Sequence, residues 1–190
     1  MVLRSVLGVG VALLAVTACI RSEPEEAPPT VPTSAVDFRR CEGFLSLLEL
    51  QTELDEYDLV RRSVDMTQSL IADNPAIQES CIVGFESPRK SRSIALNATK
   101  FHSAISAGEH AASVIRNFQE RWGGRVQIGF MGPDSYQLVL NQEDVGSLVG
   151  FRKGPYTIQL RTLYKEDVTP LVEVDQLANY AEVVRSRLPD

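Results

Sequence analysis

The residues from Arg125 to Thr162 alternate between apolar and polar or small side chains, and this pattern constrains the fold more than any other stretch. A repeat of two residues is typical of a strand with one buried face. Turn residues, Gly132-Pro133 and Lys153-Gly154-Pro155, separate the alternating runs. We therefore expect a series of antiparallel strands joined by short turns. The alternating apolar positions are Val126, Ile128, Phe130, Tyr136, Leu138, Leu140, Tyr156, Ile158 and Leu160.

Two stretches near the start of the domain have the apolar spacing of a helix. The first covers 46–57 and begins with Ser46 and Glu49, which are spaced as a capping box. The second covers 58–72 and is followed by Asp73-Asn74-Pro75, a helix-ending sequence. The spacing leaves open whether these are two helices or one kinked helix.

Two further helices are predicted later in the chain. The helix over 107–122 has Ser106 and Glu109 in capping-box spacing and an apolar stripe that ends at Trp122, which we expect in the core. The helix over 176–188 follows Asp175, the expected cap.

The order of these elements predicts the fold class. Two strands are expected around 81–85 and 94–101, between the second and third helices. The chain then alternates groups of helices and strands, with no sign of a second domain. We expect one α+β domain over 37–190, in which helices cover one face of an antiparallel sheet.

Residues 1–18 have the features of a secretory signal, with Arg4 before an apolar run that is shorter than the about 20 residues of a membrane span. The segment Ala15-Val16-Thr17-Ala18-Cys19 resembles the lipobox of bacterial lipoproteins. The resemblance implies acylation of the Cys19 thiol and of the new amino terminus, and a position at the extracytoplasmic side of the cell membrane. Ordinary cleavage after Ala18 and an uncleaved anchor are the alternatives.

The chain has three cysteines, and an odd number in an exported protein needs an explanation. If Cys19 is acylated, Cys41 and Cys81 remain as a pair, which we expect to form a disulfide in an oxidising compartment. Two separate buried thiols are the alternative. Residues 19–36 are rich in proline and glutamate, which predicts an extended tether reaching up to about 50 Å from the bilayer.

The net charge of −6 argues against nucleic acid as a partner. Arg4 is the only charged side chain before Cys19, so cleavage makes the chain more acidic still. Electrostatic attraction to anionic lipid is therefore disfavoured. We expect the acyl chains to be the contact with the membrane.

No sequence motif for catalysis is present. His102 and His110, with Glu109, are too few for a zinc site, so no metal or other cofactor is expected. The acid pairs Asp55-Glu56 and Glu143-Asp144 lie in polar stretches and are expected to be solvated. We therefore expect a protein that is not an enzyme.

The region 127–156 combines aromatic residues with glycines, which mark places where a ligand or another backbone approaches closely. One interpretation is a sheet face that binds a hydrophobic ligand or a protein partner. The alternative is ordinary core packing. The residues of this candidate face are Phe130, Tyr136, Phe151 and Tyr156.

The segment Cys41-Glu42-Gly43-Phe44-Leu45-Ser46 resembles the opening of small actinobacterial-type lipoproteins of uncharacterised function. In those proteins this cysteine pairs with one on a later strand, here Cys81. The segment Gly154-Pro155-Tyr156-Thr157-Ile158-Gln159-Leu160 and a terminal helix are similar in order to theirs, and also to extracytoplasmic sensor domains of bacterial membrane kinases. The resemblance implies the fold and no catalytic residue.

Three functional hypotheses follow. The first is a lipid-anchored binding or sensing module of the bacterial envelope that is not an enzyme. The second is an accessory subunit of an envelope protein complex. The third is an envelope hydrolase that uses clustered carboxylates.

Overall fold

A computed structural model describes residues 36–122, 125–142, 145–164 and 168–190. Its helices are α1 (Leu47–Leu54), α2 (Thr67–Asp73), α3 (Ala104–Trp122) and α4 (Val174–Arg187). Its strands are β1 (Val60–Asp65), β2 (Ile77–Ser87), β3 (Arg92–Phe101), β4 (Val126–Ile128), β5 (Tyr136–Gln142), β6 (Val145–Lys153) and β7 (Tyr156–Tyr164). No helix in these residues is long and apolar enough to span a bilayer.

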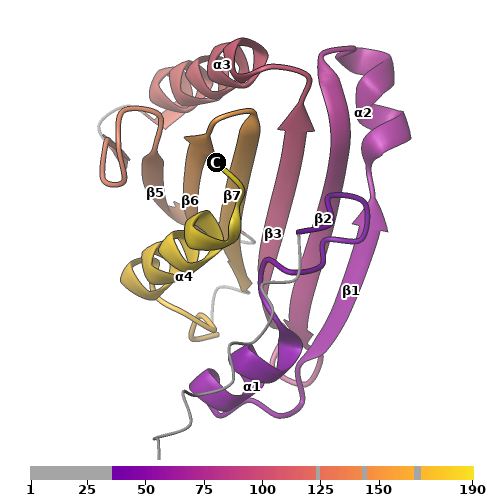
Figure 1. Ribbon diagram of the computed structural model, residues 1–190. Helices are drawn as coiled ribbons and strands as arrows, with labels where there is room; N and C mark the ends of the chain where they lie inside the picture. The colour runs from indigo at the N-terminus through magenta and orange to yellow at the C-terminus, as the bar shows by residue number, and fades with distance from the viewer. Residues whose placement is uncertain (1–35, 123–124, 143–144, 165–167) are drawn as a thin grey trace, which may run out of the picture. The chain divides into compact units, whose positions relative to one another are not determined.

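The strands form one antiparallel sheet in the order β1-β2-β3-β7-β6-β5-β4 (Figure 1). β7 lies between β6 and β3, so the strands that precede and follow α3 belong to the same sheet. The predicted alternation is confirmed in β7, where Tyr156, Ile158 and Leu160 are buried and the residues between them are not. The α+β class and the antiparallel sheet are therefore confirmed.

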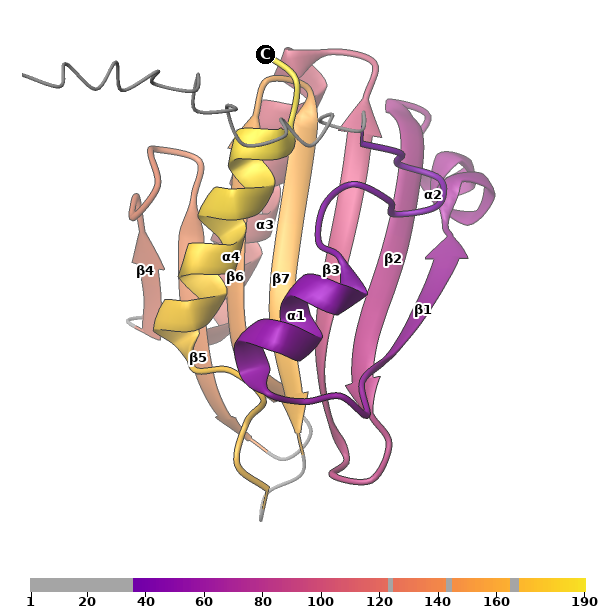
Figure 2. The same ribbon diagram turned by 60° about the horizontal axis from the view of Figure 1, so that its bottom comes forward.

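The front face of the sheet, which carries Val83, Leu96 and Leu160 as direct cross-strand neighbours, is covered by α1 and α4 (Figure 2). The apolar side chains on one face of α4 lie in this core. They are Leu177, Ala181, Val184 and Leu188, and all four are buried. The N-cap of α4 lies two residues earlier than predicted. Glu173, and not Asp175, is the N-cap, and it forms a capping box with Gln176.

The N-terminal end of the domain is attached to the same face. The predicted Ser46–Glu49 capping box is confirmed, with both hydrogen bonds at 3.1 Å. The predicted disulfide between Cys41 and Cys81 is also confirmed, and both residues are fully buried. It joins the segment before α1 to the middle of β2.

The predicted helix over 58–72 is wrong in its first half. β1 pairs with β2 over its whole length, and only α2 is helical. Val60 and Val64 are four residues apart, a spacing that places side chains on one side of a helix and of a strand alike. Their branched side chains favour a strand, and β1 supplies hydrogen-bond partners to the otherwise open edge of β2.

The rear face of the sheet, which carries Ile82, Asn97 and Gln159, packs against α3 at one end (Figure 2). α3 begins earlier than predicted, because Ser103 rather than Ser106 caps it and accepts a hydrogen bond of 3.1 Å from the Ser106 backbone N–H. Its expected core stripe is only partly buried. Ala107 and Ala111 are buried, but Trp122 is half-buried because α3 covers a short part of the sheet.

Candidate binding site on the rear face of the sheet

A single row of side chains crosses the rear face through five strands. Ile82 on β2 pairs with Asn97 on β3, and Asn97 pairs with Gln159 on β7. Gln159 in turn pairs with Gly150 on β6, which pairs with Tyr136 on β5. Direct cross-strand neighbours have Cβ atoms about 5 Å apart, so the two amide side chains lie next to each other. The fold thus brings together residues that are far apart in the chain.

A hollow of about 160 Å³, called here the rear hollow, lies over this row and the next one. In the next row, Arg161 pairs with Ala95 on one side and with Leu148 on the other. The rear hollow therefore has two amides and one guanidinium within an apolar wall. Its lining residues are Ile82, Ala95, Asn97, Leu148, Gln159 and Arg161.

Two polar side chains of the rear hollow have groups without a partner in the described part of the chain. Asn97 Oδ1 is buried and has no hydrogen-bond partner in the described part of the chain. An unpaired buried carbonyl oxygen costs about 1–3 kcal/mol, so such atoms are rare in folded proteins. The Arg161 side chain is exposed and forms no ion pair with any described residue.

Tyr136 holds Gln159 in place. The amide nitrogen Nε2 of Gln159 donates a hydrogen bond of 2.7 Å to the hydroxyl oxygen of Tyr136. The ring lies over Gly150, and a Cβ atom at Gly150 would be 2.3 Å from Tyr136 Cζ. Burial raises the pKa of the Tyr136 phenol, so the hydroxyl stays protonated and neutral. Gly150 is therefore needed for this arrangement.

The Gly150→Ala substitution is expected to lower the free energy of unfolding by about 1–3 kcal/mol, because the new methyl group displaces the Tyr136 ring. Urea denaturation measures the change. Gly84→Ala is the matched control on the same face, since its Cβ would meet only the flexible Glu86 side chain at 3.5 Å. Equal stability of the two variants would contradict the role assigned to Gly150.

A second hollow of about 220 Å³, called here the α3 hollow, lies between the sheet and α3 and shares Asn97 and Gln159 with the rear hollow. Its walls are mainly apolar, and His110 contributes the only imidazole among its lining residues. Burial lowers the pKa of His110, so its ring is neutral at neutral pH. The positive charge at the site therefore comes from Arg161. The further lining residues are Leu70, Ile77, Thr99, Val114 and Thr157.

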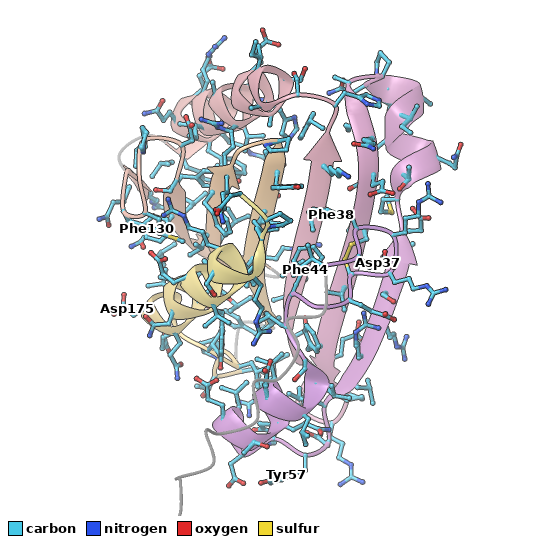
Figure 3. All side chains as sticks on the ribbon, in the orientation of Figure 1. Asp37, Phe38, Phe44, Tyr57, Phe130 and Asp175 are labelled. Carbon is cyan, nitrogen blue, oxygen red and sulfur yellow. A yellow bond between two sulfur atoms is a disulfide. The ribbon has the colours of Figure 1, made fainter. Side chains whose placement is uncertain are left out.

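The four aromatic residues predicted as a ligand or partner face do not share one face. Tyr136 is buried on the rear face, where it reaches the site through Gln159. Phe151 and Tyr156 are buried in the front core, and the Tyr156 ring stacks on Phe38 with centroids 5.1 Å apart. Phe130 is half-buried against that core, in the loop between β4 and β5 (Figure 3). Core packing, the alternative interpretation, accounts for Phe151 and Tyr156.

The other predicted features have these positions. Cys19, the signal over 1–18 and the tether, apart from Val36, lie outside the described residues, as does the pair Glu143-Asp144. His102 is exposed, and the described residues contain no cluster of side chains that could hold a metal ion. The expectation that Glu56 is solvated is wrong. It is only 7% exposed and accepts hydrogen bonds from Lys90 and Arg92.

Asn97, Gln159 and Arg161 were not predicted as site residues. Each occupies a polar position of an alternating strand, and such positions normally face water. In the sequence they are marked only by polar side chains at alternating positions of two strands. Asn97 lies in β3, and Gln159 and Arg161 lie two residues apart in β7. The sequence does not show that β3 and β7 are neighbours, so this signal does not identify a site.

No protein-family model matches this chain, and no curated protein matches it either. Among solved structures, the chain is similar to the extracellular domain of PknH from Mycobacterium tuberculosis. The TM-score is 0.49 and the identity is 7%, over 75% of this chain and 91% of that one. No function follows from this likeness.

Proposed function

We propose that this protein is a lipid-anchored, extracytoplasmic binding module of the bacterial envelope that is not an enzyme, and that the rear hollow is its ligand site. The observation that carries the proposal is the cluster of Asn97, Gln159 and Arg161 on adjacent strand positions. A pocket with an apolar wall and a few convergent polar groups is the usual form of a small-molecule site.

The side chains at the site suit binding better than catalysis. Two buried hydroxyls on the same face, those of Ser80 and Thr99, are hydrogen-bonded to each other at 2.9 Å. Within the described residues, neither hydroxyl is bonded to a carboxylate or an imidazole that could activate it. Amides and a guanidinium recognise polar ligands without reacting with them.

Native mass spectrometry of the full chain, released from its own membranes in mild detergent, tests the binding function. The expected result is a small-molecule adduct that is lost in an Asn97→Leu, Arg161→Gln double variant. The control is Arg116→Gln, which removes an exposed guanidinium from α3 and is expected to keep the adduct. A wild-type protein that shows its bare mass, and gains no thermal stability from an extract of the host's small molecules, would contradict the proposal.

The anchor is supported by the lipobox-like segment and the proline-rich residues after it. In a bacterial host, the wild-type protein is expected to incorporate a clickable palmitate analogue, and the Cys19→Ala variant is expected to lose that label. Cys41→Ala is the matched control and should remain labelled, because Cys41 belongs to the disulfide. Undiminished labelling of the Cys19 variant would rule out acylation at this residue.

A further inference from the structure

We infer that the ligand of the rear hollow is a small amphipathic carboxylate that also carries an N–H or O–H donor. This inference rests on the proposed binding function and adds the chemical class of the ligand. It is carried by three observations: the charge of Arg161, the unpaired oxygen of Asn97 and the apolar wall of the rear hollow.

Arg161 selects for a carboxylate. Its direct cross-strand neighbours, Ala95 and Leu148, are apolar and supply no counter-charge. On the same face, Glu86 already pairs with Arg62 at 3.6 Å. The planar guanidinium matches a carboxylate through two parallel hydrogen bonds. No carboxylate among the described residues forms an ion pair with Arg161, so its guanidinium is available to an anionic ligand.

Asn97 selects for a hydrogen-bond donor. Its buried Oδ1 atom has no partner among the described residues, and a ligand N–H or O–H would remove the cost of that unpaired oxygen. Gln159 beside it donates an N–H to the Tyr136 hydroxyl. The buried end of the Asn97 amide is its oxygen, so the group offered to a ligand there is a hydrogen-bond acceptor.

The apolar wall sets the size of the ligand. Ile82, Ala95 and Leu148 line a hollow of about 160 Å³, which fits one branched aliphatic group together with its polar end. Asn97 and Arg161 lie in adjacent rows, about 7 Å apart along the strands. The long arginine side chain covers part of that distance. An N-acyl amino acid with an aliphatic side chain combines all three features.

The experiment uses N-acetylleucine as the probe and calorimetric titration of the mature protein as the measurement. Two related molecules each lack one polar group, so they test the two polar contacts one at a time. N-acetylleucinamide lacks the carboxylate, and isocaproate lacks the amide N–H. We expect saturable binding of N-acetylleucine, and binding about tenfold or more weaker for either relative, because a hydrogen bond with a charged or buried partner is lost.

Variants test the same contacts from the protein side. Arg161→Gln is expected to weaken N-acetylleucine binding about tenfold or more and to remove its preference over N-acetylleucinamide. Arg161→Lys keeps the charge and should retain much of that preference. Arg116→Gln on α3 is the control and should bind as the wild-type protein does.

Three results would overturn the inference: equal binding of N-acetylleucine and N-acetylleucinamide, an unchanged affinity in Arg161→Gln, or no binding at millimolar concentrations. If native mass spectrometry still detects a bound molecule in these cases, the binding function stands and only the ligand class is wrong. If neither method detects binding, both proposals fail.

Discussion

Reduction of the Cys41–Cys81 disulfide is expected to lower the free energy of unfolding by about 4 kcal/mol. The bridge joins residues 40 positions apart, and its loss frees that loop in the unfolded chain. The net stability of a small domain is only about 5–15 kcal/mol, so this is a large share. The bridge also fastens the segment before α1, in which two backbone hydrogen bonds between Asp37 and Glu42 close a turn.

Urea denaturation with and without a reductant measures this effect. The Cys41→Ala, Cys81→Ala double variant is the control. It should resemble the reduced wild-type protein and should not respond to the reductant. A wild-type protein whose stability changes by less than about 1 kcal/mol on reduction would contradict the loop-entropy argument.

The Glu56→Gln substitution is expected to destabilise the domain by about 3–5 kcal/mol. Glu56 lies just after α1, and its Oε1 atom accepts hydrogen bonds from Lys90 at 2.5 Å and from Arg92. The Arg92 side chain is only 15% exposed, and its Nε already lacks a partner among the described residues. Loss of the carboxylate therefore leaves a largely buried guanidinium without a counter-charge.

Glu49→Gln is the matched control for this prediction. Glu49 pairs with Arg187 at 2.9 Å, but its side chain is 52% exposed. Glu49→Gln is therefore expected to lower the free energy of unfolding by less than about 1 kcal/mol. Glutamine also preserves the capping box of α1. Thermal and urea denaturation of both variants give the comparison. Equal losses would mean that burial does not strengthen the Glu56–Arg92 pair.

A double substitution distinguishes charge from packing. Glu56→Leu together with Arg92→Met removes both buried charges and keeps side chains of similar size. Such replacements of a buried ion pair are often neutral or stabilising. We expect the double variant to be more stable than Glu56→Gln, and a larger loss would show that the ion pair itself is required.

The local features of the chain could be predicted from sequence because they depend on neighbouring residues. The capping box of Ser46 and Glu49, the stripe of α4 and the period of two in β7 all arise within about four residues. Sequence reasoning failed at β1, where the spacing of Val60 and Val64 fits both the helical period and the strand period. It also failed at Glu56, whose partners Lys90 and Arg92 are more than 30 residues away.

The sequence by itself determined the α+β class, the pairing of Cys41 with Cys81 and the positions of most helices and strands. Only the tertiary structure decided the candidate site. Asn97 and Gln159 become neighbours because β7 inserts between β6 and β3, and this order depends on the packing of distant segments. Periodicity assigns each polar residue to a face of a strand, but it does not show which strands are adjacent.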